Sequence, residues 1–352
     1  MIILNKKMKT LINTSLKLVF FCFLLISSFY LVSQSSHPFI SCQKENAIVK
    51  KDSVIQWRFP AESDIPDNDE GKLIRTGMDI FINTGKYIGP DVTDVNKRFA
   101  GTNMSCQSCH FRGGTLKNVF GLVGVFYKYP QFDERSAGEI TIQDRVNNCM
   151  KRSLNGKAMP EASDEMNAVV SYLKWLSTYA PKGTKLDGQG IPKIELLKRA
   201  ADTAAGRLVY LKNCASCHAE DGSGVLWKSG NVKVPADSVY GYEFPPVMGQ
   251  NSYNDGAGMF RLLTAASFIY SKMPYNDAVL SVDESYDVAA FINSKPRPKY
   301  PDISKDYPDL KFKPVDFPFP PFNDNFTAEQ HKYGPYQEMM KEGEADKYAK
   351  PK

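Results

Sequence analysis

The sequence predicts a mainly α-helical protein with two tandem, similar domains followed by an extended proline-rich tail. Apolar residues recur at helical spacing in both halves of the 352-residue chain, which is long enough for two ordinary domains. The end of each half carries a related pattern, because residues 164–176 (DEMNAVVSYLKWL) resemble residues 283–294 (DESYDVAAFINS). Eight prolines lie between residues 295 and 322, and that density prevents a continuous helix or a central strand.

Residues 1–42 are typical of an export signal. Lysines at positions 6, 7, 9 and 17 lead into an apolar run at residues 18–32, which is shorter than the roughly 20 residues of a membrane-spanning helix. Residues 39–42 (FISC) resemble a lipoprotein cleavage box with Cys42 as the lipid-carrying residue. Cleavage before Cys42 without lipid and an uncleaved anchor are the alternatives. All three predict that residues 43–352 lie in the periplasm, as a membrane-anchored lipoprotein in the first case.

The charge of the chain gives no sign of a nucleic-acid partner. The formal net charge of +5 falls to +1 when the four lysines of the signal are set aside, because residues 1–42 contain no acidic residue. That balance leaves no basic nucleic-acid footprint. A hydrophobic content of 42% argues against a protein with many membrane spans.

The first domain is predicted at residues 50–181. A polar lead-in at residues 50–71 precedes helices expected at residues 71–85, 135–152 and 163–177. The last helix is the clearest, since Ser163 can cap it and a stripe of apolar residues follows at helical spacing. Residues 182–199 are predicted to form a linker, because residues 181–190 (PKGTKLDGQG) are rich in turn-forming residues.

The second domain is predicted at residues 200–296 and the tail at residues 297–352. Helices are expected at residues 200–213, 256–271 and 283–294. Aromatic residues are interspersed among the prolines of the tail. This pattern favours a tail that packs along the body of the protein over a free linker.

Two five-residue motifs carry the chemistry. Residues 106–110 (CQSCH) and 214–218 (CASCH) both have the C-x-x-C-H spacing of c-type haem attachment. Two thiols one helical turn apart reach the two vinyl groups of one porphyrin, and the histidine that follows lies beneath the iron. The motifs predict two covalently bound haem c groups in cytochrome c-like domains. The thioether residues are Cys106, Cys109, Cys214 and Cys217, and the proximal ligands are His110 and His218. A zinc site is the alternative, and export disfavours it.

The second haem is expected to use Met273 or Lys272 as its distal ligand. Only His37 and His331 remain outside the motifs, one beside the signal and one in the tail, so histidine on both faces of each iron is disfavoured. Met273 lies between two expected helices, where small c-type cytochromes place their methionine. The adjacent Lys272 is a second candidate when it is deprotonated.

Two residues compete for the distal side of the first haem. Met159 occupies the place equivalent to Met273, and Cys149 is the thiol that remains once the signal, lipid and haem cysteines are assigned. Arg135, Arg145 and Lys157 lie in the sequence around Cys149, and such charge lowers a thiol pKa and attracts anions. A buried, inert cysteine is the plain alternative.

The sequence resembles the dihaem thiosulfate dehydrogenases, also called tetrathionate synthases, from about residue 57 to residue 336. The resemblance is carried by residues 88–89, the first haem motif, 144–149, 153–157 (SLNGK), 254–259 (NDGAGM), 272–274 (KMP) and 331–336 (HKYGPY). These segments together are specific, whereas the haem motifs alone are not.

The resemblance implies a role for Cys149 as distal ligand of the first, catalytic haem and as the carrier of a transient adduct with substrate sulfur. It implies Lys272 or Met273 at the second haem. Arg135 and Arg145 match positive residues near the family's active-site cysteine, and we extend that role to Lys157. Met159 stands where the family commonly has leucine, so ligation by His110 and Met159 stays open.

The function expected from these features is oxidation of two thiosulfate ions to tetrathionate. The first haem would pass the electrons to the second, and the second to an external carrier such as a small cytochrome c or another periplasmic protein. Two alternatives remain, namely the same enzyme working as a tetrathionate reductase and a dihaem electron-transfer cytochrome without substrate. A dihaem peroxidase is disfavoured, because no well-placed distal histidine is available.

Overall fold

A computed structural model describes residues 57–183, 186–227, 241–341 and 344–348. The predicted signal, with His37 and Cys42, lies outside the described residues, so cleavage and lipidation stay predictions. The described residues belong to one compact unit. Within the described part of the chain, no helix has the length and apolar content needed to cross a bilayer.

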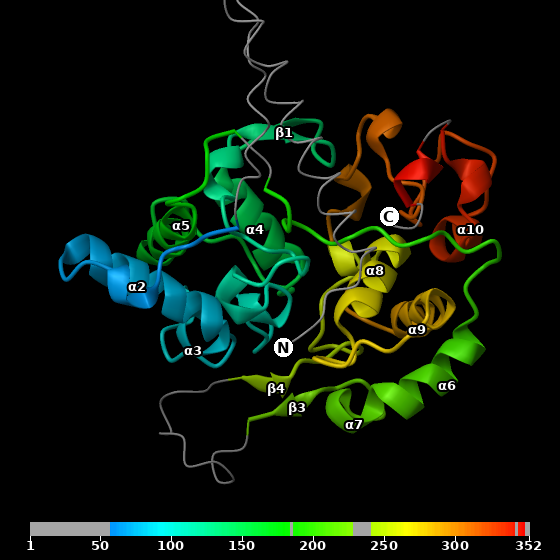
Figure 1. Ribbon diagram of the computed structural model, residues 1–352, viewed down its shortest axis with the longest axis horizontal. Helices are drawn as coiled ribbons and strands as arrows, with labels where there is room; N and C mark the ends of the chain where they lie inside the picture. The colour runs from blue at the N-terminus through cyan, green and yellow to red at the C-terminus, as the bar shows by residue number, and fades with distance from the viewer. Residues whose placement is uncertain (1–56, 184–185, 228–240, 342–343, 349–352) are drawn as a thin grey trace, which may run out of the picture. The chain divides into compact units, whose positions relative to one another are not determined.

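The first half contains α2 (Asp69–Ile82), α3 (Thr84–Ile88), β1 (Gln131–Asp133), β2 (Gly138–Ile140), α4 (Ile142–Arg152) and α5 (Asp164–Leu176). The second half contains α6 (Thr203–Asn213), α7 (Ala215–His218), β3 (Val225–Leu226), β4 (Tyr242–Phe244), α8 (Leu262–Lys272) and α9 (Val282–Ser294). A short helix, α10 (Ala328–Tyr333), follows in the tail. The strands form two antiparallel pairs, β1 with β2 and β3 with β4. The described chain is therefore mainly helical, as predicted (Figure 1).

The two halves repeat one helix crossing. The first helix of each half packs against the last, α2 on α5 and α6 on α9. A Cβ at Gly77 would collide with the carbonyl oxygen of Ala168, and a Cβ at Gly206 with that of Asp287. Each crossing therefore needs glycine, because only glycine lets the two backbones approach so closely. This shared crossing gives the repeated segments 164–176 and 283–294 the same structural role.

The ends of α5 and α4 follow local capping chemistry. Ser163 Oγ accepts a hydrogen bond from Met166 N, so α5 begins where the sequence predicts. The helix expected at 135–152 begins only at Ile142, because Thr141 and Asp144 form a capping box there. The preceding residues form the β1–β2 hairpin, whose turn Asp133 stabilises by accepting from Ser136.

The start of α8 also differs from the prediction. The helix expected at 256–271 begins at Leu262, after a 3-10 turn at Gly258–Phe260. No local side chain caps it. Instead Asp316 of the tail accepts from Leu263 N at 3.0 Å and from Arg261 Nε at 2.8 Å. This long-range cap joins the tail to the second half.

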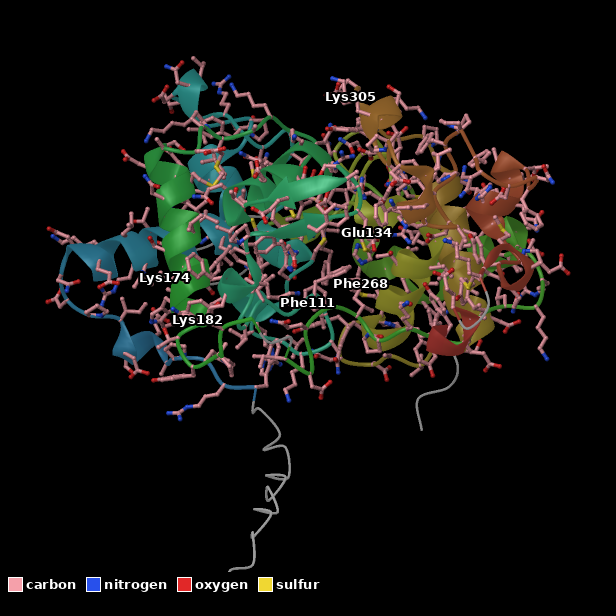
Figure 2. The ribbon with its side chains drawn as sticks, turned by 90° about the horizontal axis from the view of Figure 1, so that it is seen from above. Phe111, Glu134, Lys174, Lys182, Phe268 and Lys305 are labelled. Atoms are coloured by element: carbon pink, nitrogen blue, oxygen red, sulfur yellow. The ribbon has the colours of Figure 1, made fainter. Side chains whose placement is uncertain are left out.

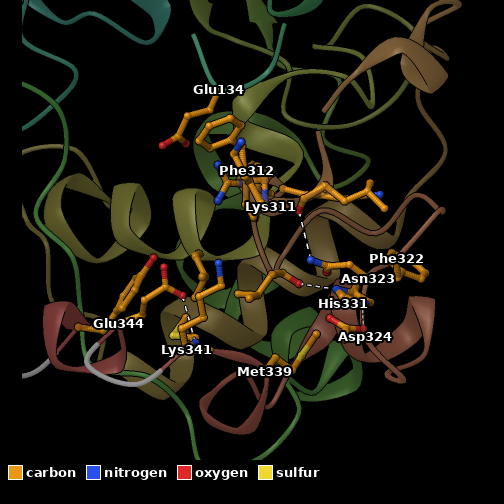
Figure 3. Close-up of a pocket in the computed structure, with 18 of the residues that line it drawn as sticks. Glu134, Lys311, Phe312, Phe322, Asn323, Asp324, His331, Met339, Lys341 and Glu344 are labelled. Atoms are coloured by element: carbon orange, nitrogen blue, oxygen red, sulfur yellow. Dashed lines mark hydrogen bonds and ion pairs between the residues drawn. The ribbon is translucent and has the colours of Figure 1, made fainter. Parts of the chain in front are cut away.

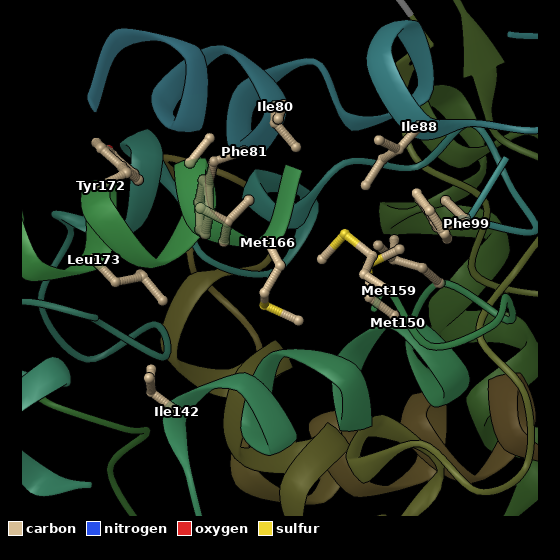
Figure 4. Close-up of a cluster of buried hydrophobic side chains, with 14 of the residues drawn as sticks. Ile80, Phe81, Ile88, Phe99, Ile142, Met150, Met159, Met166, Tyr172 and Leu173 are labelled. Carbon is tan, nitrogen blue, oxygen red and sulfur yellow. The ribbon is translucent and has the colours of Figure 1, made fainter. Parts of the chain in front are cut away.

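Two clusters of buried apolar side chains form the core, one centred on each half, and Tyr253 and Ala257 of the second half join the first cluster. The cluster of the first half lies among α2, α4 and α5 and includes Met150, Met159 and Met166 (Figure 4). The cluster of the second half is formed largely by α8 and α9 with Tyr210 of α6. The two cores place one haem motif in each half.

We expect Tyr172→Phe to lower the free energy of unfolding by about 1–2 kcal/mol. The Tyr172 side chain is buried, and its hydroxyl donates to Gly113 O at 2.7 Å. The variant leaves that carbonyl without its partner next to the first haem motif. Urea unfolding measures the change. Tyr179→Phe, at an exposed ring, is the control; equal unfolding midpoints for the two variants would contradict the prediction.

Candidate active site

The first C-x-x-C-H motif is held by its own backbone and by Thr84. Thr84 Oγ1 accepts from Cys106 N at 3.0 Å, and His110 N donates to Cys106 O at 3.0 Å. His110 Nδ1 donates to Phe120 O at 2.7 Å. That bond fixes the imidazole tautomer and leaves Nε2 as the nitrogen that can bind a metal.

A cavity of about 300 Å³ opens directly over this motif. Cys106, Cys109 and His110 line it, and Cys149 and Arg145 of α4 line it as well. The Cys149 thiol lies within hydrogen-bonding reach of the His110 ring. The structure therefore brings together five of the residues that the sequence predicts for the first haem and its substrate.

The residues of this cavity fit a covalently attached haem. Cys106 and Cys109 would hold the porphyrin through thioether bonds, and His110 and Cys149 would be the donors available to its iron. The remaining wall is largely apolar, as a porphyrin ring requires, and its apolar residues include Phe81, Leu122, Val125, Ile142, Val146 and Leu173.

The charge around Cys149 differs from that around the attachment thiols. Burial raises the pKa of Cys149, but Arg145, a hydrogen bond with His110 and the more distant Arg135 together lower it to about 7. Burial raises the pKa of Cys106 to about 11 and that of Cys109 to about 12. Arg145 Nη1 donates to Cys149 Sγ at 3.5 Å. The positive field acts on Cys149, as a reactive thiolate or an anion-binding site requires.

Met159 belongs to the core and does not line the cavity. Asn147 holds its backbone on both sides, since Met159 N donates to Oδ1 at 2.8 Å and Met159 O accepts from Nδ2 at 3.0 Å. The side chain is 2% exposed and packs among other methionines (Figure 4). The geometry favours Cys149 over Met159 as the distal group.

The three predicted cations lie in different surroundings. Arg145 lines the cavity. Arg135 donates to Asp306 Oδ2 at 2.9 Å and to Gly256 O at 2.8 Å, so its charge is directed to the tail and the second half. Lys157 is exposed, its ammonium lies 5.6 Å from the centre of the Phe99 ring, and it does not line the cavity. Arg145 is therefore the cation of the three that is placed at the site.

The loop before β1 supplies residues that the sequence did not reveal. Lys128, Tyr129 and Gln131 line the cavity. The Tyr129 hydroxyl is hydrogen-bonded with Arg145 and with Gln131. These residues follow no periodic pattern and no known motif; the one available signal is a lysine inside an aromatic segment, 126–132 (FYKYPQF).

The second motif has the same histidine geometry as the first. His218 Nδ1 donates to Pro245 O at 2.7 Å, and burial lowers the pKa of this ring, which favours its neutral form. Met273 follows the end of α8 and packs against the second core cluster, which Cys214 also contacts. Lys272 is the last residue of α8. Both candidate distal ligands therefore lie on one turn.

The histidine of the tail is engaged elsewhere. His331 Nδ1 donates to Val315 O at 2.7 Å, and Nε2 contacts Asp324 Oδ1 at 3.0 Å. His331 lines a cavity of about 470 Å³ formed mostly by tail residues (Figure 3). None of the residues around that cavity belongs to either motif. Both ring nitrogens of His331 serve the tail, which agrees with its exclusion as a haem ligand.

A chain of aromatic rings joins the two halves. The His110 ring lies 5.8 Å from that of Phe120, and Phe120 stacks on Phe268 of α8 at 5.8 Å. Phe111, next to His110, lies 5.6 Å from Phe268 and 5.2 Å from Tyr275 (Figure 2). The first motif is therefore in continuous aromatic contact with the helix that ends at Lys272.

Comparison with protein-family models divides the chain in two. Residues 95–181 match "SoxA/TsdA, cytochrome c domain". Residues 201–292 match "Cytochrome C oxidase, cbb3-type, subunit III". Each matched segment contains one C-x-x-C-H motif, so the fold is two cytochrome c domains and the protein carries two covalently bound haem c groups.

Curated relatives share about a third of the residues. A thiosulfate dehydrogenase of Psychrobacter arcticus is 36% identical over 252 residues, which is 71% of each chain. The thiosulfate dehydrogenase of Stutzerimonas stutzeri is 36% identical over 69% of this chain and 73% of its own. That of Allochromatium vinosum is 36% identical over 70% of this chain and 86% of its own.

A solved structure is similar as well. Thiosulfate dehydrogenase (TsdBA) from Marichromatium purpuratum, in its as-isolated form, aligns with a TM-score of 0.63 and 29% identity. The alignment covers 75% of this chain and 54% of that one, so this chain spans about half of its length.

Proposed function

Because this chain belongs to the thiosulfate dehydrogenase family, we propose that it joins two thiosulfate ions into tetrathionate in the cavity beside Cys149. One observation carries the proposal. The thiol with a lowered pKa lies within hydrogen-bonding reach of His110 and beside Arg145, in the cavity that also holds both attachment thiols. A cytochrome that only transfers electrons does not need a cysteine beside an arginine at this place.

The first task of the site is to bring like charges together. Thiosulfate is a dianion, so two substrate ions repel each other and repel a thiolate. Arg145 lies beside Cys149 and binds the sulfonate end of the first ion. Tyr129 lies beside Arg145 and lines the same cavity, so both side chains face the place where the substrate would bind.

The second task is to hold the sulfur covalently. The Cys149 thiolate forms a bond with the outer sulfur of thiosulfate, and two electrons leave as that S–S bond forms. The outer sulfur of a second thiosulfate then attacks the bound substrate sulfur. The bond to Cys149 breaks, tetrathionate leaves, and the cysteine is a thiolate again. The charge balances, because each turnover consumes two dianions and releases one dianion and two electrons.

The haem groups, when bound, accept these electrons one at a time. We propose that they move from the first haem to the second, and from there to an external carrier such as a small cytochrome c. Met273 or the neighbouring Lys272 would be the second donor to this haem, and a thioether from Met273 would raise its potential.

We also propose that the protein works in the periplasm. The support is the apolar run at residues 18–32, which four lysines precede, and the small Ser41 before Cys42. Lipidation of Cys42 would anchor the protein to the membrane. Mass spectrometry of the amino terminus of the natively exported protein distinguishes a lipid on Cys42 from simple cleavage.

The direct test uses the purified dihaem protein. Adding thiosulfate should reduce the haems, seen as the sharpened absorption of ferrous cytochrome c, and tetrathionate should form at one ion per two electrons. Protein-film voltammetry with both ions reports the direction. A current only with tetrathionate assigns the enzyme as a reductase, and no response to either ion assigns a simple electron carrier.

We expect Lys157→Gln to leave kcat/KM for thiosulfate essentially unchanged. Lys157 is exposed and stands outside the cavity, so solvent and salt screen its charge from the substrate. Steady-state reduction of an added cytochrome c measures this. A large rise in KM in this variant would show that Lys157 reaches the substrate and would overturn the placement described above.

A further inference from the structure

Asp306 of the proline-rich tail binds two arginines at once. Its side chain is 4% exposed. Oδ2 accepts from Arg135 Nη1 and from Arg152 Nη1, each at 2.9 Å, and Oδ1 accepts from Arg152 Nη2 at 2.7 Å. A buried carboxylate in a charge-assisted network of this kind fixes the geometry of all its partners.

The two arginines come from the two segments that border the active site. Arg152 is the last residue of α4, three positions after Cys149, and it is 7% exposed. Its guanidinium lies 3.9 Å from the centre of the Tyr300 ring, at the start of the tail. Arg135 lies in the turn of the β1–β2 hairpin, whose first strand contributes Gln131 to the wall of the cavity.

The loop at residues 253–257 binds the same two arginines and the end of α4. Gly256 O accepts from Arg135 at 2.8 Å and from Arg152 at 3.2 Å. A Cβ at Gly256 would meet Arg152 Nη1 at 2.8 Å and Tyr300 Cβ at 2.7 Å, so glycine is needed there. Asn254 Nδ2 donates to Lys151 O at 2.8 Å, and Asn254 N donates to Arg152 O at 3.1 Å. The free carbonyls at the end of α4 are thus satisfied by the second half.

This arrangement ties the position of Cys149 to the tail. The carboxyl end of α4 has contacts with Asp306 and the 253–257 loop, and Tyr253 and Ala257 of that loop belong to the core of the first half. Two cations share one anion, so a surplus positive charge remains at the border of the site. Without Asp306, the buried guanidinium of Arg152 and the partly buried one of Arg135 lose their carboxylate, and such groups move toward water or toward another anion.

We propose that Asp306 is a positioning residue for the Cys149 site, which holds α4 through Arg152 and fixes the direction of Arg135. It does not touch the substrate. The proposal rests on the proposed function for its kinetic consequence, whereas its spectroscopic consequence concerns only where Cys149 lies relative to the first haem. Asp306 lies 171 residues after Arg135, so this role joins the tail to the chemistry of the first domain.

The test uses Asp306→Asn in the full-length dihaem protein. The amide keeps the shape but loses the charge, so α4 and Arg135 shift. We expect a changed low-spin ferric EPR signal from the first haem and an unchanged signal from the second. We expect kcat/KM for thiosulfate to fall about 10- to 100-fold, because small misplacements of reacting groups have effects of this size. Asp306→Glu, which keeps the charge, should recover most of both properties.

Asp309→Asn is the matched control. Asp309 lies in the same tail and pairs with the exposed Lys311, and asparagine can also accept from Lys311 N. It should match the parent protein in spectrum and rate. If Asp306→Asn does not fold, Asp306→Asn with Arg152→Gln removes one charge from each side of the buried pair and should show the same spectroscopic change.

The outcomes separate the two proposals. The positioning role is overturned if Asp306→Asn changes neither the EPR signal of the first haem nor kcat/KM. It is also overturned if Asp309→Asn lowers kcat/KM to the same extent. A changed signal in a protein whose parent form does not respond to thiosulfate would support the positioning role and reject the proposed function. A changed signal together with a lowered rate supports both.

Discussion

Cys149→Gly should abolish thiosulfate turnover while both haem groups stay attached. The variant leaves the attachment residues untouched, and the sulfur that carries the substrate is removed. We expect kcat to fall by about 10³-fold or more, because a covalent step cannot proceed without its nucleophile. A pyridine haemochrome assay counts the haems, and steady-state reduction of an added cytochrome c measures turnover. Residual activity close to that of the parent protein would reject the covalent mechanism.

Met159→Leu is the control for this variant. Met159 is a buried core residue whose backbone Asn147 holds, and leucine conserves its volume. It should keep normal activity and the ferric spectrum of the first haem, whereas Cys149→Gly should lose the thiolate signature. The opposite pattern, with the spectrum changed by Met159→Leu and retained in Cys149→Gly, would assign ligation to His110 and Met159.

Arg145→Gln should lower kcat/KM for thiosulfate by about 100-fold. This is the size of effect seen when one preorganised donor is removed from a developing negative charge. Arg145 is the cation beside Cys149 Sγ, and without it the effect of burial on the thiol is offset less strongly, by His110 and Arg135 alone. The pKa of Cys149 therefore rises in the variant, and the pH at which activity increases should move upward, since the thiolate form reacts.

Two comparison variants show whether the Arg145 effect is local. Lys157→Gln removes a cation nearby in sequence but outside the cavity, so it separates a local contact from a general change in charge. Arg145→Lys keeps the charge without the forked geometry and should recover part of the activity. Equal losses in Arg145→Gln and Lys157→Gln would mean that the net charge of the surface steers the substrate, with no special role for Arg145.

The parts of the fold that were predicted are those decided by neighbouring residues. Ser163 caps α5 through Met166 N, three positions away, and the start of that helix is correct. The start of α8 is wrong because its cap is Asp316, which lies 53 residues from Leu263. The helix expected from residue 135 is wrong at its start because Asp133 stabilises a hairpin turn over residues that are compatible with a helix.

In the candidate site, too, contacts between residues close in sequence were predicted and contacts between distant residues were not. Cys149 and Arg145 lie one helical turn apart, so sequence spacing predicts their contact. Arg135 and Lys157 look equivalent in sequence, yet one is bound by Asp306 and the other is exposed on the surface. Partners so distant along the chain leave no trace in a local pattern, because only the folded core brings them together.

The crossing of the first and last helix in each half determines the order in which the parts of the protein can fold. The first core cannot close before α5, which ends at Leu176, has packed on α2, and the chain between them must form a long loop. Residues 106–110 lie within that loop, so their thiols stay accessible for haem attachment until α5 has packed on α2. The second half repeats the sequence of events with α6 and α9. The tail is made last, so Asp306 and Asp316 reach their arginines only after both cytochrome domains exist.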